Sequence, residues 1–107
     1  MAVDFETVNR NVKNYVNDVE NAMPVEKAVL FGSYAKGTAT EQSDIDICFF
    51  LESFGGKRRL DIIKELLVLM RGYKGVYFEP IAFPSCELYN DNPFVKEILR
   101  SGREIAV

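Results

Sequence analysis

The segment Asp44–Leu51 constrains the fold of this chain more than any other part of the sequence. In an extended strand, one face would carry Ile45, Ile47, Phe49 and Leu51, and the other would carry Asp44, Asp46, Cys48 and Phe50. Away from its aspartate end the segment is therefore apolar on both faces, which is typical of an interior strand covered by helices on both sides. The sequence predicts an α/β (α+β) fold built around a central strand over residues 44–51.

The other elements follow from hydrophobic periodicity and turn residues. Apolar residues at helical spacing predict a helix over residues 5–22, with Asp4 as its N-cap and Met23-Pro24 as its end. Further helices are predicted over 33–36, over 57–71 and from Asn92-Pro93 to Gly102, and further strands over 27–31, 76–83 and 103–107. Pro80 lacks an N–H donor, so we expect strand 76–83 to lie at an edge or to be bulged. These elements give a small sheet of three to four strands flanked by about four helices.

Two of these helices are marked by apolar residues at helical spacing. The residues are Leu60, Ile63, Leu66, Leu67 and Met70 in the first helix, and Phe94, Val95, Ile98 and Leu99 in the second. Two neighbouring features leave alternatives open. The cationic run Lys57-Arg58-Arg59 is either a solvated face or a surface for an anionic partner. Phe54 is either an exposed docking aromatic or a cap packed against the helix.

Length and composition indicate one globular domain over residues 1–107. The apolar content of 48% and the charged content of 27% are ordinary for a soluble protein. No apolar run approaches the roughly 20 residues that span a bilayer, and the acidic N-terminus lacks the layout of a secretory signal. We therefore expect a cytoplasmic protein that does not bind membranes.

Charge and residue usage restrict the chemistry. The formal net charge of −3 argues against strong binding to nucleic acid. The two cysteines, Cys48 and Cys86, form no CxxC motif, and the chain has no histidine, which excludes the usual zinc sites. A general base must then be a carboxylate, a perturbed lysine or tyrosine, or solvent.

Two short motifs carry the functional signal. Gly32-Ser33 follows an apolar strand, and such a turn can bring backbone N–H groups close to phosphate. Asp44 and Asp46 are two residues apart, so on a strand they face the same side and can share divalent metal ions. Alone, Gly32-Ser33 also fits a plain turn with a serine cap. Alone, Asp44-Ile45-Asp46 also fits the solvent-facing start of a strand. Together they predict a site for a metal-bound nucleoside triphosphate.

With the order of the elements, these motifs resemble the nucleotidyltransferase fold shared with DNA polymerase beta, in the small form called MNT-type. The resemblance implies a mixed sheet, ATP held at Gly32 and Ser33, and three carboxylates that bind two Mg²⁺ ions. Asp44 and Asp46 match the first two carboxylates. Glu79 is the only acidic residue in the third predicted strand and takes the third position, where the family usually has Asp. Lys36 either contacts a phosphate or is a solvated helix end.

The function implied by the resemblance is metal-dependent transfer of a nucleoside monophosphate, expected to be AMP from ATP, to a hydroxyl acceptor. Glu79 could then accept the proton of that hydroxyl. MNT-type proteins often pair with a separate HEPN-domain toxin and modify one of its tyrosines, so the partner is expected to be such a protein or a second copy of this chain. The alternative is a non-catalytic antitoxin that neutralises its partner by contact.

Overall fold

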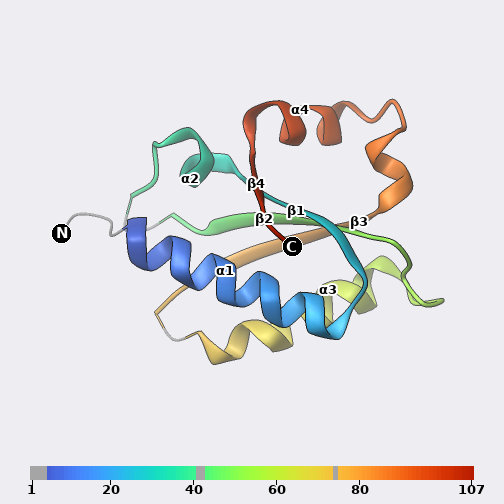
Figure 1. Cartoon of the computed structure of the whole chain (residues 1–107), viewed down its shortest axis with the longest axis horizontal. Helices are drawn as coiled ribbons and strands as arrows, with labels where there is room; N and C mark the ends of the chain where they lie inside the picture. Colours follow the sequence, from blue (N-terminus) through green and yellow to red (C-terminus); the bar gives the residue numbers. More distant parts are fainter. Residues whose placement is uncertain (1–4, 41–42, 74) are drawn as a thin grey trace.

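A four-stranded mixed sheet forms the centre of the computed structural model, which describes residues 5–40, 43–73 and 75–107 (Figure 1). The strand order is β3-β2-β1-β4; β1 is antiparallel to both β2 and β4, and β2 is parallel to β3. The elements are α1 (Phe5–Ala22), β1 (Val25–Phe31), α2 (Gly32–Lys36), β2 (Ile45–Leu51), α3 (Arg59–Leu69), β3 (Phe78–Pro84), α4 (Pro93–Ser101) and β4 (Arg103–Ile105). The predicted fold class is confirmed.

The two faces of β2 pack into separate cores, as the sequence predicts. Ile45, Ile47, Phe49 and Leu51 join the core formed with α1 and α3, whereas Cys48 and Phe50 join a second core with Val95 and Ile98 of α4. Figure 1 shows α1 and α3 on one side of the sheet and α4 on the other. The interior position of β2 follows from its apolar residues on both faces.

Several element boundaries differ from the prediction. β1 begins at Val25 and α3 at Arg59, each two residues from the expected start. β2 begins at Ile45, whose N–H donates to the carbonyl of Tyr77 (2.8 Å), so Asp44 lies just before the strand rather than in it. β3 is an edge strand, in agreement with the expectation from its proline. The predicted N-cap Asp4 lies outside the described residues.

The helix predicted over residues 57–71 forms as α3, but only some of its apolar residues are buried. Leu60 and Leu67 are 56% and 43% exposed, and the fully buried residues are Ile62 and Leu66. Ile62 and Leu66 pack into the core shared with α1 and the sheet, and the Tyr15 hydroxyl on α1 donates to the backbone carbonyl of Leu66 (2.7 Å). The resulting orientation leaves Leu60 and Leu67 facing solvent.

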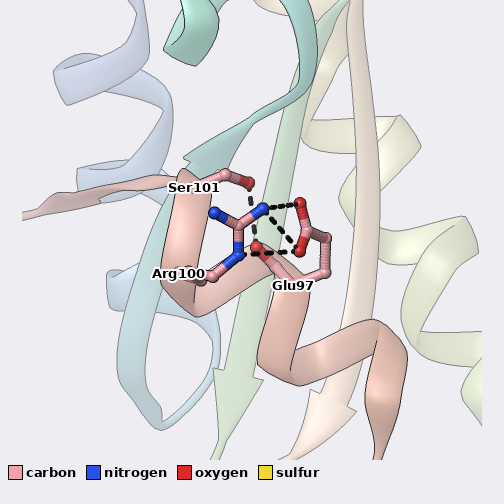
Figure 2. Close-up of polar contacts among 3 residues, drawn as sticks. All are labelled: Glu97, Arg100 and Ser101. Atoms are coloured by element: carbon pink, nitrogen blue, oxygen red, sulfur yellow. Dashed lines mark hydrogen bonds and ion pairs between the residues drawn. The ribbon is translucent and has the colours of Figure 1, made fainter.

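α4 begins and ends as predicted. The Asn92 side chain accepts hydrogen bonds from the N–H groups of Phe94 and Val95, and Gly102 follows the last turn. Val95 and Ile98 are buried, but Phe94 and Leu99 remain 51% and 37% exposed. Figure 2 shows the solvent side of this helix, where the Arg100 guanidinium binds both carboxylate oxygens of Glu97 and the Ser101 hydroxyl donates to the Glu97 carbonyl.

No helix in the described ranges combines the length and the apolar character that crossing a membrane would require.

The bond between Tyr15 and α3 gives a stability prediction. Tyr15→Phe keeps the buried ring but removes one of the two donors to the Leu66 carbonyl, which still accepts the Met70 N–H. We therefore expect a loss of about 0.5–1.5 kcal/mol in the free energy of unfolding, measured by urea denaturation. Tyr89→Phe is the control, because Tyr89 is 82% exposed, and it should change stability by less than about 0.5 kcal/mol. Equal effects of the two substitutions would contradict this role of Tyr15.

Candidate functional site

Three strands bring the candidate site residues to one end of the sheet. In the antiparallel pairing Phe31 lies opposite Asp46, and in the parallel pairing Asp46 lies opposite Glu79. Gly32 directly follows Phe31, so Asp46 is held between Gly32 on one side and Glu79 on the other. Residues that are far apart in the sequence therefore meet at a single carboxylate.

Gly32 is required here for two independent reasons. Its φ of +71° lies in the left-handed region, which side chains other than glycine rarely adopt. A Cβ atom at this position would also collide with the Oδ2 atom of Asp46. The turn after β1 therefore allows the Asp46 carboxylate to pack directly against backbone.

Asp46 and Glu79 are register partners on β2 and β3, and their carboxyl groups influence each other. Partial burial, then the neighbouring Glu79 carboxyl group, and last the charge of Asp44 together raise the pKa of Asp46 to about 6. Glu79 is exposed on its edge strand and lies opposite Asp46, close enough for its charge to raise the pKa of Asp46. The site thus concentrates negative charge that a bound cation would neutralise.

The Gly-Ser turn continues into α2, where the Ser33 carbonyl accepts the N–H groups of Gly37 and Thr38 and closes the short helix. The Ser33 side chain is half-buried, and its hydroxyl has no recorded partner within the described part of the chain. Lys36 is exposed and lies toward α4. The pKa of Glu97 is lowered mainly by its hydrogen bond from Arg100, and the charge of Lys36 contributes.

The donor set fits a hard divalent cation. All three acidic side chains offer carboxylate oxygens, which Mg²⁺ prefers, and their mutual repulsion would be relieved by a cation. Over residues 5–40, 43–73 and 75–107, however, no three acidic, cysteine or histidine side chains are gathered into a ready-made metal centre. Asp46 and Glu79 lie opposite each other on β2 and β3, and exposed Asp44 is near enough for its charge to affect Asp46.

An aromatic cluster that the sequence analysis did not identify supports the start of β3. Phe78, directly before Glu79, stacks on Tyr15 (centroids 4.3 Å apart, planes at 12°) and meets Tyr73 edge-on (5.5 Å, 87°). The Tyr73 hydroxyl donates to Asp18 (2.5 Å). This cluster fixes the backbone from which Glu79 projects, and only the packing of distant elements reveals it.

The structure bears on the alternatives left open for the cationic run Lys57-Arg58-Arg59 and for Phe54. Lys57 pairs with Glu65 (2.9 Å), Arg58 pairs with Asp61 (3.3 Å), and the Arg59 guanidinium lies over the Phe83 ring (4.6 Å). Each cation is thus engaged within the chain. Phe54 is partly buried against the core, which agrees with a cap rather than a docking aromatic.

The close approach of Asp46 to Gly32 can be tested against a matched glycine. Gly37 also has a positive φ of +75°, but nothing lies within 4 Å of the Cβ it would gain. We expect Gly37→Ala to lose about 1–2 kcal/mol of unfolding free energy through backbone strain, and Gly32→Ala to lose more. The extra loss should disappear when Gly32→Ala is combined with Asp46→Ala, as measured by a double-mutant cycle. An undiminished loss would contradict the proposed collision.

The raised pKa of Asp46 predicts a pH-dependent effect of Asp46→Asn. The folded state holds the Asp46 proton up to about pH 6, whereas the unfolded state releases it near 3.8, so wild type loses stability as the pH rises between these values. In metal-free buffer with EDTA, the variant should therefore gain stability over wild type at pH 8 but not at pH 3.5. Solvent screening keeps the gain below the roughly 1.4 kcal/mol per pKa unit of an unscreened group.

Urea denaturation of both proteins at the two pH values measures this difference. Glu52→Gln is the control, because Glu52 is exposed and follows the opposite end of β2. The same stability difference for Asp46→Asn at both pH values would contradict the inference.

Comparison with known proteins agrees with this geometry. Residues 10–103 match the model of the nucleotidyltransferase domain family. A Methanocaldococcus jannaschii protein named "Putative protein adenylyltransferase MJ0604" is 33% identical over 97 residues, which cover 86% of this chain and 91% of that protein. The fold matches the crystal structure of a "putative nucleotidyltransferase" from Sulfolobus solfataricus, with a TM-score of 0.60 at 18% identity over 90% of this chain and 77% of the other. The chain therefore belongs to the nucleotidyltransferase domain family.

Proposed function

We propose that this protein transfers AMP from ATP to a hydroxyl group, with Mg²⁺ as cofactor and a tyrosine of a partner protein as acceptor. The observation that carries the proposal is the Asp46–Glu79 pair, held against the Gly32-Ser33 turn at one end of the sheet. Family membership supports nucleotidyl transfer, and the name of the Methanocaldococcus relative supports AMP as the group and a protein as the acceptor.

In the proposed reaction, the acceptor oxygen attacks the α-phosphorus of ATP. The bond from that phosphorus to the bridging oxygen breaks, pyrophosphate leaves, and the acceptor proton passes to the Glu79 carboxylate. Glu79 suits this role because it is exposed at the sheet edge, where an acceptor can reach it. Among the described residues, none forms a hydrogen bond with the Ser33 hydroxyl. In the proposed reaction this hydroxyl donates to a terminal phosphate oxygen of ATP.

Asp44, Asp46 and Glu79 would hold Mg²⁺, expected as two ions. When bound, the metal neutralises charge on the phosphate oxygens and helps to align the attacking and leaving groups. Glycine at position 32 keeps the Asp46 carboxylate close to the turn, and therefore close to the phosphates that the turn would contact. Lys36 is a weaker candidate for phosphate binding, because it also interacts with Glu97.

A non-catalytic binding module remains the second candidate, because glutamate replaces the usual third aspartate. Such a module would neutralise its partner by contact, and the partner under either proposal is a HEPN-type protein or a second copy of the chain. The two functions differ in one observable, which is covalent labelling of an acceptor.

The test combines labelling with binding. We expect wild type with Mg²⁺ and ATP labelled at the α-phosphate to label a tyrosine-containing peptide, and not the matched phenylalanine peptide. Asp46→Asn should abolish labelling, and Glu79→Gln should lower it by on the order of 10²-fold or more while the affinity for a non-hydrolysable ATP analogue changes little. Glu52→Gln should behave as wild type.

Calorimetric titration separates the outcomes. Mg²⁺-dependent binding of the analogue without any labelling by wild type would favour the binding module. If Asp46→Asn retained wild-type labelling in Mg²⁺, the catalytic site proposed here would be wrong.

A further inference from the structure

α3 has an outer surface that the rest of the chain does not cover. We define the α3 outer surface as Leu60, Lys64, Leu67 and Val68 of α3 with Arg71 of the 3-10 turn Met70–Gly72 that follows it. Leu60, Leu67 and Val68 are 56%, 43% and 52% exposed. The opposite side of the helix is buried through Ile62 and Leu66. A helix that is apolar on both sides is typical of a helix buried on both sides.

The other long helix on this side of the sheet provides a contrast. The solvent side of α1 carries Asn9, Lys13, Asn17 and Glu20, all exposed and all polar. Ordinary solvent exposure therefore does not explain three large apolar residues on α3.

The α3 outer surface carries two cations; Lys64 contributes to the lowered pKa of Asp61, whose main cause is the hydrogen bond from Arg58. Lys64 and Arg71 are exposed, and no ion pair is recorded for either one among the described residues. The nearby acids are already engaged: Glu65 pairs with Lys57 and Asp61 with Arg58. The surface is thus cationic on a chain whose net charge is −3.

The spacing of the residues on the α3 outer surface indicates that its ligand is a helix. Leu60, Lys64, Leu67 and Arg71 are separated by four, three and four positions, which is the spacing of a coiled-coil seam with leucine at d and a cation at a. A second copy offers only leucines and cations at these four positions, so in neither direction would they set a carboxylate against Lys64 or Arg71. A helix with acidic residues at the facing positions would neutralise both cations.

A hollow of about 290 Å³ lies beside this surface and can receive an apolar side chain. Its lining consists of Ala22, Met23, Lys64, Glu65, Val68 and Leu69. Because Lys64 and Val68 belong both to the hollow and to the α3 outer surface, one ligand can occupy both.

We propose that the α3 outer surface binds an amphipathic helix of another protein, whose contacting stripe combines leucines with Glu or Asp. This interface is distinct from the acidic site around Asp46 and does not depend on the proposed reaction. The ligand class follows from the exposed leucines, the two unpaired cations and their heptad spacing.

The test uses two synthetic helical peptides of equal length with leucine at every d position. One peptide carries Glu at the a positions and the other carries Lys. In ¹⁵N–¹H correlation spectra of the full chain, we expect the Glu peptide to shift resonances of residues 60–71 and 22–23. It should bind on the order of tenfold more tightly than the Lys peptide, as two surface charge pairs allow.

Charge reversal makes the test specific. The double variant Lys64→Glu/Arg71→Glu should exchange the preference, so that the Lys peptide binds more tightly. The matched reversal on α1, Arg10→Glu/Lys13→Glu, and the site variant Asp46→Asn should both retain the preference for the Glu peptide. Absence of shifts at residues 60–71, an unchanged preference after reversal, or a dimer in sedimentation equilibrium that buries α3 would each overturn the proposal.

Discussion

β2 makes backbone hydrogen bonds with a neighbour on each side, and the geometry of the candidate site depends on this double pairing. The antiparallel bond pattern with β1 sets Asp46 opposite Phe31, one residue before the Gly-Ser turn, and the parallel pattern with β3 sets it opposite Glu79. A shift of one residue in either register would turn the carboxylate to the opposite face. The registers are in turn fixed by the cores on the two faces of β2, which bury Phe49 and Phe50 completely.

Placing the Asp46 carboxylate beside two other carboxylates destabilises the folded state. Asp46 is partly buried next to Glu79 and Asp44, and the raised pKa of Asp46 records the cost of placing its negative charge there. The core beneath compensates for this cost, because Tyr15 stacks on Phe78 and Tyr73 packs edge-on against both rings at the start of β3. An acidic cluster on a strongly packed support is expected where function requires charges that folding alone would separate.

The molecule thus presents two surfaces of different chemistry. The acidic end of the sheet suits a cation and phosphate, whereas the α3 outer surface combines leucines with cations and suits an acidic helix. The positions of these surfaces on separate elements mean that a partner on α3 need not obstruct the site at Asp46.

Local rules in the sequence determined most of the elements. The apolar residues on both faces of residues 45–51 predicted an interior strand, Pro80 predicted an edge, and Asn92-Pro93 predicted the start of α4, because each signal acts through neighbouring backbone. The orientation of α3 was not determined in this way, since apolar residues occur on both of its sides and two faces compete for burial. The packing of Ile62 and Leu66 into the core shared with α1 and the sheet decided between them. The meeting of Gly32, Asp46 and Glu79 likewise required the strand registers, because no local interaction links positions so far apart in the chain.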